Sequence, residues 1–418
     1  MHDILIKNAK IFPDKTKHLE KDDKENGLTD IAINDGFIIE LSNNITAEGK
    51  KVINADGRVV LPGFIDSHMH LVKALTYENI YSSKNKVIKS LDEAIEIFAK
   101  NYKNFSQEDI YSRGKKVLEM AVSQGTIAIR SHVSLQPDVE LKGLEPLLKL
   151  KNDFDDLINL QLVAFITDPL ENKKLNEELY RKAVKKGVDA IGGCPYISHD
   201  HQKAIDFLFK LGKDLNMPLD LHVDESDSPQ ANSLEYLAEK RINNGYPHEI
   251  IAGHCTSLGV MKKSEANRII DKVSRAGLNI ITLPSCNLYL MGRNRRGITK
   301  VEDFLKKQVN IAYASDNIRD VFHPYGNADI LEEGLITAKL IQAGTPKEIK
   351  NVLHMGTYNP AKMMGLKNYG FVENSEANLV MLNAKSFHET IITQPAKQLV
   401  IKSGNLVIEE EDFVESFF

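Results

Sequence analysis

The sequence has few cysteines, no large excess of charge of one sign and no long apolar run. Its three cysteines, Cys194, Cys255 and Cys286, are widely separated, which argues against a disulfide framework and fits a reducing compartment. The net charge of −5 gives no reason to expect nucleic acid or an anionic membrane as a partner. No segment approaches the roughly 18 apolar residues of a spanning helix, and the initial MHDILIKNAKIF carries charges too early for a signal peptide. We therefore expect a cytoplasmic protein.

Two β-rich ends enclose a long α/β body. Near the start, Asp-Gly pairs at 35–36 and 56–57 lie between alternating apolar residues, a pattern that predicts two hairpins. Near the end, ANLVMLNA and KQLVIKSGNLVIEEE have the composition of strands joined by turns. We expect the two ends, residues 1–58 and 369–418, to form one small β-sandwich domain.

The body alternates strand candidates with amphipathic helical segments that end at Gly or Asn. Besides FIDSHMH, the strand candidates are GTIAIRSHV, NLQLVAFITD, DAIGGCPY, PLDLHVDE, EIIAGHC, NIITLPS and NIAYASD. Alternation of this kind is typical of parallel barrels. Residues 59–368 are therefore predicted to form a distorted (β/α)₈ TIM barrel.

The segment LPGFIDSHMHLVKAL places His68 and His70 one residue apart after an apolar run. Side chains alternate across a strand, so both imidazoles are expected on one face, where they suit a transition metal. Alone, however, the pair is more simply explained by ordinary hydrogen bonding. His132 follows another strand candidate, and we expect it to pack beside the site rather than to bind metal.

Other polar residues stand at strand ends, where barrels carry their catalytic groups. These are His222 and Glu225 in PLDLHVDE, His254 in EIIAGHC and Asp316 in NIAYASD. Each of these residues, taken alone, has another interpretation that does not involve a metal. His222 could be a hydrogen-bonded barrel histidine, Asp316 a helix N-cap and Glu225 a surface carboxylate. Together they favour a metal site at one rim.

Over nearly its whole length, the sequence resembles the amidohydrolase superfamily and, within it, the cytosine deaminase-like group. The resemblance extends to the bacterial cytosine deaminases and to N-isopropylammelide isopropylaminohydrolase. It rests on long motifs in the same order, namely LPGFIDSHMH, HVDES, AGHCTSLG, LPSCNLYLMGRNRRGIT and ASDNIRDVFHPYGNADIL.

The resemblance implies that His68, His70, His222 and Asp316 hold one divalent metal per subunit. Two-metal members use a lysine at the end of the fourth strand, whereas this chain has Thr167 there. Three imidazoles and a carboxylate fit Zn²⁺ or Fe²⁺ better than Ca²⁺ or Mg²⁺. We expect Zn²⁺ or Fe²⁺ and a homo-oligomer.

The resemblance also implies a metal-dependent hydrolase that deaminates an amino-substituted, pyrimidine-like heterocycle through a metal-bound hydroxide. In this scheme His254 hydrogen-bonds the hydroxide, Asp316 receives its proton and Glu225 protonates the ring nitrogen. The remote alternative is a catalytically inactive metal-binding homologue.

Two positions depart from the cytosine deaminases. Thr167 stands where they have a glutamine that binds the pyrimidine carbonyl edge, and Asn317 replaces a second aspartate. We expect both residues to contact the substrate. The departures leave open an aminohydrolase that removes an amine from an s-triazine or another N-substituted ring. Lys73 and Arg319, near the rim motifs, could reach a polar or anionic substituent or could face solvent.

Overall fold

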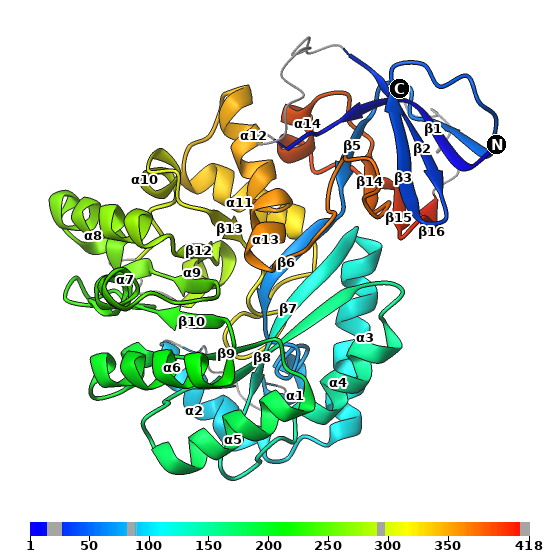
Figure 1. Ribbon diagram of the computed structural model, residues 1–418. Helices are drawn as coiled ribbons and strands as arrows, with labels where there is room; N and C mark the ends of the chain where they lie inside the picture. The colour runs from blue at the N-terminus through cyan, green and yellow to red at the C-terminus, as the bar shows by residue number, and fades with distance from the viewer. Residues whose placement is uncertain (15–26, 82–87, 89, 291–296, 410–418) are drawn as a thin grey trace.

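The computed structural model describes residues 1–14, 27–81, 88, 90–290 and 297–409. Part of the motif LPSCNLYLMGRNRRGIT, residues 291–296, therefore lies outside the described residues. The chain forms a large barrel surrounded by helices and, beside it, a sheet built from both ends of the sequence (Figure 1).

The barrel consists of eight parallel strands that follow one another in chain order. They are β6 (Phe64–Met69), β7 (Thr126–Ser134), β8 (Asn159–Ile166), β9 (Ala190–Gly193), β10 (Leu219–Val223), β11 (Ile250–His254), β12 (Asn279–Thr282) and β13 (Ile311–Tyr313). Each predicted strand of the body is present. The first and last strands are joined by an isolated parallel bridge between Met69, the last residue of β6, and Asp316, three residues after β13. The predicted barrel is confirmed.

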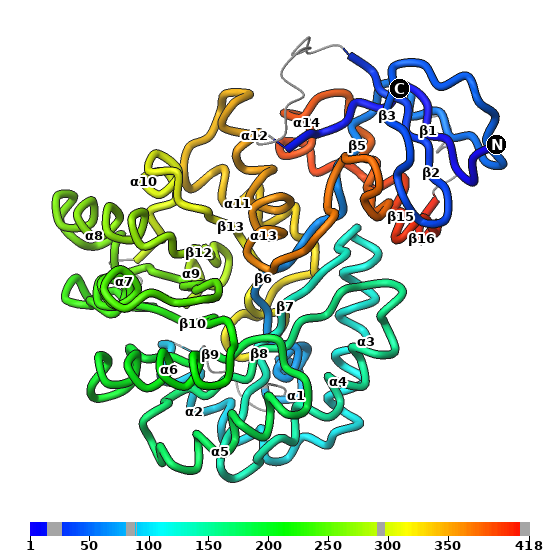
Figure 2. Tube along the Cα trace, viewed as in Figure 1, coloured from blue at the N-terminus to red at the C-terminus, as the bar shows by residue number. Residues whose placement is uncertain are grey.

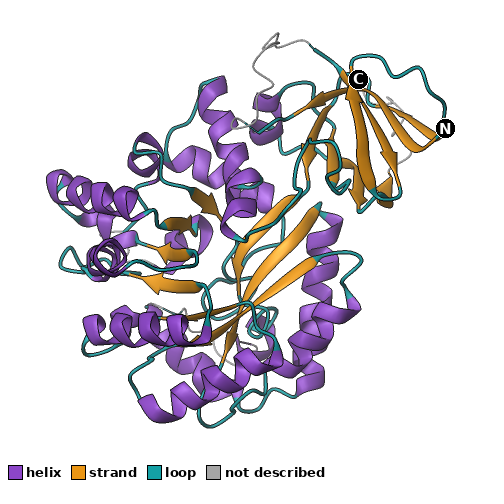
Figure 3. Cartoon of the chain, in the orientation of Figure 1, coloured by secondary structure: helices purple, strands orange, loops and turns teal. Residues whose placement is uncertain are grey.

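Helices form the outer layer of the barrel (Figure 3). They are α1 (Tyr77–Tyr81), α2 (Leu91–Tyr102), α3 (Gln107–Ser123), α4 (Leu144–Asp153), α5 (Lys173–Lys186), α6 (His201–Leu215), α7 (Ser233–Asn244), α8 (Lys263–Ala276), α9 (Pro284–Leu290), α10 (Val301–Lys306), α11 (Ile330–Leu340), α12 (Pro346–Met355) and α13 (Tyr358–Met363). Local sequence sets several of the limits. Ser90 and Ser106 cap the first turns of α2 and α3, and Asn216 ends α6 in the left-handed conformation.

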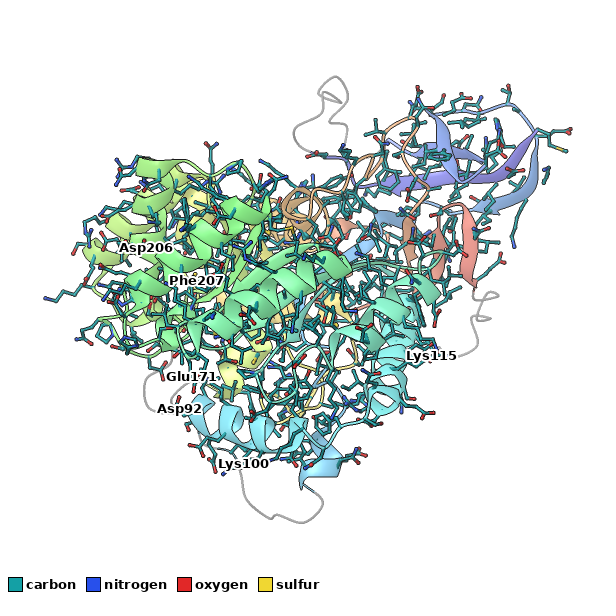
Figure 4. All side chains as sticks on the ribbon, turned by 60° about the horizontal axis from the view of Figure 1, so that its bottom comes forward. Asp92, Lys100, Lys115, Glu171, Asp206 and Phe207 are labelled. Carbon is teal, nitrogen blue, oxygen red and sulfur yellow. The ribbon has the colours of Figure 1, made fainter. Side chains whose placement is uncertain are left out.

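The outer faces of these helices are polar. Lys100 and Lys115, for example, lie at the periphery of the helix layer (Figure 4). Among the described residues, no helix combines the length and the apolar character needed to cross a membrane.

Both ends of the chain contribute to the second sheet, and the N-terminus lies beside it (Figure 2). Its strands are β1 (His2–Ile11), β2 (Thr29–Asn34), β3 (Phe37–Ser42), β4 (Gly49–Asn54), β5 (Val59–Pro62), β14 (Leu379–Leu382), β15 (Lys397–Lys402) and β16 (Asn405–Glu409), and α14 (Phe387–Ile392) follows β14. Its core is aliphatic and separate from that of the barrel. The limits predicted at residues 58 and 368 stay predictions.

One of the two hairpins predicted near the start is wrong. The Asp-Gly pair at 35–36 does join the antiparallel strands β2 and β3. The pair at 56–57 instead joins β4 and β5, which both run parallel to β1 and pair with successive parts of it. Asn8 adopts a left-handed conformation with a φ of 56° and accepts a hydrogen bond from Gly57 N at 2.8 Å. The turn therefore carries the chain along β1 and not back on itself.

Candidate active site

The barrel brings the four predicted metal ligands to one end of its strands. His68 lies in β6, His70 follows β6, His222 lies in β10 and Asp316 stands three residues after β13. One ligand atom from each lies within 4.8 Å of the others, and all four residues are buried. Residues 314–329 contain no helix, so Asp316 is not a helix N-cap.

The backbone around these ligands is unusual. Asp316 has a φ of 61°, and His254 has a φ of 67°. Such left-handed conformations are uncommon for residues other than glycine and often occur at functional sites. Gly253 is needed for a different reason, because a Cβ there would lie 3.2 Å from Cε1 of His68. The His68 ring therefore packs directly against the backbone of β11.

Asp66 anchors two of the ligand-bearing segments. Its carboxylate accepts hydrogen bonds from Ser315 N at 3.2 Å, from the Ser315 hydroxyl and from His68 N at 3.4 Å. These bonds tie the end of β6 to the segment that carries Asp316. Burial raises the pKa of Asp66 to about 6.

The donor set fits a transition metal. His70 Nε2 lies 3.1 Å from His222 Nε2 and 3.3 Å from Asp316 Oδ1, and His68 Nε2 lies 3.7 Å from the same oxygen. A tetrahedron with bonds of about 2.0–2.1 Å to a central metal has edges of about 3.3–3.4 Å. These separations are therefore close to those of ligands around a single ion.

The hydrogen-bonding state of the cluster supports the same interpretation. Both ring nitrogens of His68 and Oδ1 of Asp316 are buried and have no hydrogen-bond partner among the described residues. Buried polar atoms without partners are costly unless something binds them. Burial holds the pKa values of His68, His70 and His222 well below their usual range. The imidazoles are thus neutral, which is the form that binds a metal.

His254 lies beside this cluster and is held by two neighbours. Asn287 Nδ2 lies 3.1 Å from His254 Nδ1, and Glu225 Oε1 lies 3.4 Å from the same nitrogen. When the Asn287 amide donates to Nδ1, the ring carries its proton on Nε2, since a neutral imidazole has one N–H. Nε2 is buried with no partner among the described residues and is thus available as a donor.

Glu225 is a buried acid and not a surface carboxylate. It is 6% exposed, and the Tyr196 hydroxyl donates to its Oε2 at 3.1 Å. Burial, followed by the charge of Asp316, raises the pKa of Glu225 to about 8. Glu225 therefore holds a proton at neutral pH, as a general acid must.

His132 packs beside the ligands, as predicted. Its ring centroid is 4.1 Å from that of His68, and its Nε2 lies 3.1 Å from Asp220 Oδ1. Arg130 donates to the other oxygen of Asp220 at 3.0 Å. His68, His132 and Asp220 are close enough to form a second ligand group, but the guanidinium already neutralises Asp220. We interpret this buried layer as support for His68.

The two predicted substrate contacts lie in different surroundings. Asn317 is buried, and its Nδ2 donates to Cys286 Sγ at 3.3 Å. Thr167 is half-buried just beyond β8. Two residues earlier, within the strand, Phe165 packs its ring 4.6 Å from that of His222, whereas Thr167 itself stands in a bend one residue past the end of β8.

β8 is the third strand of the barrel, so the prediction that Thr167 ends the fourth strand is wrong. The fourth strand, β9, ends at Gly193 and is also not followed by a lysine.

The two basic residues near the rim also differ. Lys73 is buried, with its ammonium 3.6 Å from the centre of the Phe322 ring, and does not face solvent. Arg319 is half-buried and donates from Nε to Gly326 O at 2.9 Å, which fixes it to its own loop.

Sequence reasoning missed several residues of the site. Tyr196, Asn287, Asp66 and Cys286 contact predicted site residues but were given no role. Asp66 lies in the motif LPGFIDSHMH, two residues before His68, and so shares its face of β6. Cys286 and Asn287 lie in the motif LPSCNLYLMGRNRRGIT, which was the available signal for them, whereas Tyr196 lies in none of the quoted motifs.

Comparison with known proteins gives consistent matches. A model of the amidohydrolase family matches residues 59–407. The chain is 30% identical to N-isopropylammelide isopropyl amidohydrolase of Pseudomonas sp. (strain ADP), over 99% of this chain and 98% of the relative. It is 28% identical to a pterin deaminase of Rhizobium rhizogenes (strain K84 / ATCC BAA-868), over 90% of this chain and 87% of that protein.

Solved structures agree with these sequence matches. The crystal structure of 5-methylcytosine deaminase from Klebsiella pneumoniae, liganded with phosphonocytosine, superposes with a TM-score of 0.88 at 27% identity, covering 99% of this chain and 100% of that one. The predicted superfamily is confirmed, and with it an enzyme that hydrolyses C–N bonds and whose His and Asp cluster implies a divalent metal. The chain belongs to the amidohydrolase family.

Proposed function

We propose that this enzyme hydrolytically deaminates an amino-substituted, pyrimidine-like heterocycle. The observation that carries the proposal is the pairing of a neutral imidazole cluster with Glu225, a buried acid whose pKa is about 8. A carboxylic acid that is protonated at neutral pH beside a metal-ligand set suits a reaction in which a ring nitrogen must gain a proton while water attacks.

His68, His70, His222 and Asp316 are the residues proposed to hold the metal, which we take to be Zn²⁺ or Fe²⁺. When bound, the metal acts as a Lewis acid that polarises a water molecule, so that the water gives up a proton near neutral pH. Asp316 is placed to receive that proton. His254, with its Nε2–H free to donate, stabilises the negative charge that develops on oxygen.

Glu225 completes the proton transfers. It protonates the ring nitrogen next to the attacked carbon, and the C–N bond then breaks with its electron pair going to the exocyclic nitrogen. That nitrogen takes up a proton and leaves as ammonia or an amine, while the oxygen of water stays on the ring carbon. Tyr196 keeps the carboxyl group oriented through its hydrogen bond to Oε2.

The relatives support a small nitrogen heterocycle as substrate. Their names specify an N-isopropylammelide, a pterin and a 5-methylcytosine. Thr167 and Asn317 are the proposed substrate contacts. The charge of the buried Lys73 ammonium lowers the pKa of Glu225, and this influence supports a role for Lys73 in attracting an anionic or carbonyl substituent.

A second candidate is an aminohydrolase that removes an amine from an s-triazine or another N-substituted ring. The observation that favours it is Asn317, which replaces a carboxylate beside the leaving group with an uncharged amide. We also propose that the protein works in the cytoplasm as a homo-oligomer. Its three free, buried cysteines support a reducing compartment.

Release of ammonia or amine, measured over a panel of aminated pyrimidines, pterins and triazines, tests the proposal. The metal content of the same sample is measured alongside. We expect turnover of at least one such ring, with about one Zn or Fe per chain. A metal-loaded protein that releases nitrogen from none of these rings would contradict it.

A further inference from the structure

His254 stands among the imidazoles of the candidate metal site without belonging to the ligand set. Its ring centroid lies 4.9 Å from that of His222 and 5.6 Å from that of His68. The rings of the two proposed ligands His68 and His222 are themselves 4.6 Å apart by the same measure. Proximity alone therefore does not separate His254 from the proposed ligands.

The four imidazoles differ in what the protein offers to their ring nitrogens. Both nitrogens of His68, and Nδ1 of His70 and of His222, are buried and have no hydrogen-bond partner among the described residues. His254 instead has Asn287 at 3.1 Å from Nδ1, and its unpartnered nitrogen is Nε2. Burial lowers the pKa of His254 to about 4, so the ring is neutral at neutral pH and carries a single proton. The chemistry of His254 thus depends on which nitrogen holds that proton.

We propose that Asn287 is a positioning residue that keeps the proton of His254 on Nε2, so that His254 donates a hydrogen bond to the reacting oxygen and cannot act as a metal ligand. This inference rests on the proposed function and assigns a further residue to it. An imidazole that binds a metal usually gives its other N–H to an acceptor. At His254, Nδ1 meets an amide donor instead, so the lone pair is used on Nδ1 and the proton stays on Nε2.

Asn287 is held where this hydrogen bond needs it. It lies in α9, which begins directly after Leu283, and its backbone N–H donates to Leu283 O at 2.9 Å. Ser285 N, in the same turn, donates to the buried Glu333 of α11 at 3.3 Å. The Asn287 side chain is buried and makes no other hydrogen bond within the described part of the chain. A carboxamide that only stabilised α9 would bond to α9 itself, whereas this one bonds to His254.

Glu225 is the other neighbour of Nδ1, and it cannot take over the role of Asn287. Its Oε1 lies 3.4 Å from Nδ1, farther away than the Asn287 amide. In the proposed reaction Glu225 gives its proton to the substrate, and the carboxylate that results would attract the imidazole proton to Nδ1. The Asn287 amide is a donor at every stage of the reaction and so keeps that proton on Nε2.

The test compares the wild type with Asn287→Asp, which replaces the donor by an acceptor of nearly the same shape, in the zinc-loaded full chain. ¹⁵N NMR of histidine-labelled protein reads the tautomer, and the signals of His254 are those that disappear in His254→Gln. We expect the proton on Nε2 in the wild type and on Nδ1 in Asn287→Asp. The variant should keep its zinc and its KM and lose kcat by about 10²–10³, the scale of one lost oxyanion donor. Asn243→Asp, the same change at an exposed position of α7, is the control and should match the wild type.

The tautomer is measured without a substrate, so it decides the role of Asn287 even if no ring is turned over, the result that would contradict the proposed function. A proton on Nδ1 in the wild type, an unchanged tautomer in Asn287→Asp, or a changed tautomer with unchanged kcat overturns that role and leaves the proposed function standing. Circular dichroism and thermal melting check that Asn287→Asp folds. If it does not, Asn287→Leu, which has a similar volume and no donor, takes its place. It should remove the preference of His254 for the proton on Nε2, and an unchanged preference overturns the role of Asn287.

Discussion

Two buried aspartates, one in the terminal sheet and one at the rim of the barrel, have opposite surroundings. In the terminal sheet, Asp30 is 2% exposed, forms an ion pair with Lys7 at 2.5 Å and accepts hydrogen bonds from Asn8 N and Ile45 N, each at 2.9 Å. Burial pushes its pKa up, but these donors outweigh that effect and lower it. Both oxygens of this carboxylate therefore have hydrogen-bond or ion-pair partners within the protein.

At the barrel rim, Asp316 is equally buried, and its nearest neighbours are imidazoles. Burial again opposes ionisation, yet His70, His254 and His68 keep the pKa of Asp316 well below its ordinary value. Its Oδ1 nonetheless accepts no hydrogen bond from any described residue. A satisfied carboxylate such as Asp30 stabilises the fold, whereas a buried carboxylate oxygen without a hydrogen bond, among imidazole nitrogens, has the surroundings expected of a metal ligand. Four predictions test this contrast.

The largest effect is expected from His222→Ala. Removing one of four ligands should abolish stoichiometric metal binding and with it the activity, because neighbouring groups cannot replace a ligand. Metal content by elemental analysis and ammonia release are the measurements. His199→Ala, a change at an exposed histidine, should retain both. A His222→Ala protein that keeps its full metal content would refute the ligand assignment.

Glu225→Gln should keep the metal and lower kcat by about 10² or more, the scale of general acid catalysis. In the wild type, Glu225 must be protonated, so kcat should fall as the pH rises through about 8. The variant should lack this descending limb. The pH profile of kcat for both proteins is the measurement. Loss of metal from the variant, or an unchanged limb, would show that Glu225 is not the acid.

The clustering of the four proposed ligands could be predicted from the sequence because their positions follow from two regularities. Alternation along β6 places His68 and His70 on one face, and a barrel gathers the ends of its strands at one rim. His222 and Asp316 then join them although they are far away in the sequence. The parallel barrel strands themselves were predictable from the alternating pattern.

The contacts around the ligands could not be predicted in this way. Tyr196 reaches Glu225 from a 3₁₀ turn (Pro195–Ile197), and Asn287 reaches His254 from α9. Both contacts depend on how segments that are far apart in the sequence pack against each other, which no periodicity encodes. The Asp-Gly pair at 56–57 misled for a similar reason. A hairpin signal reports a turn, but the left-handed Asn8 in β1 determines which strand the chain then joins.

Cytosine should be a poor substrate, with a kcat/KM at least a hundredfold below that of the preferred ring. Thr167 cannot donate and accept as a carboxamide does, and Asn317 lacks the charge of an aspartate. Each unmet contact costs about 1–3 kcal/mol, and every 1.36 kcal/mol is tenfold in rate. Steady-state ammonia release measures the ratio. A kcat/KM for cytosine above about 10⁵ M⁻¹s⁻¹, within the ordinary enzyme range, would contradict this prediction.

The smallest effect on catalysis is expected from Asp30→Asn, which sharpens the contrast from the structural side. The change removes the ion pair with Lys7 and should lower the free energy of unfolding by about 1–3 kcal/mol, while kcat and metal content per folded molecule stay within twofold. Because the folded-state pKa of Asp30 lies below its unfolded value, its stabilisation is present at neutral pH and is lost as the pH falls through the folded pKa. Urea unfolding at pH 7 and below pH 4 should therefore show a deficit that shrinks on acidification. Loss of metal from a folded Asp30→Asn protein would mean that the two carboxylates are not separate in function.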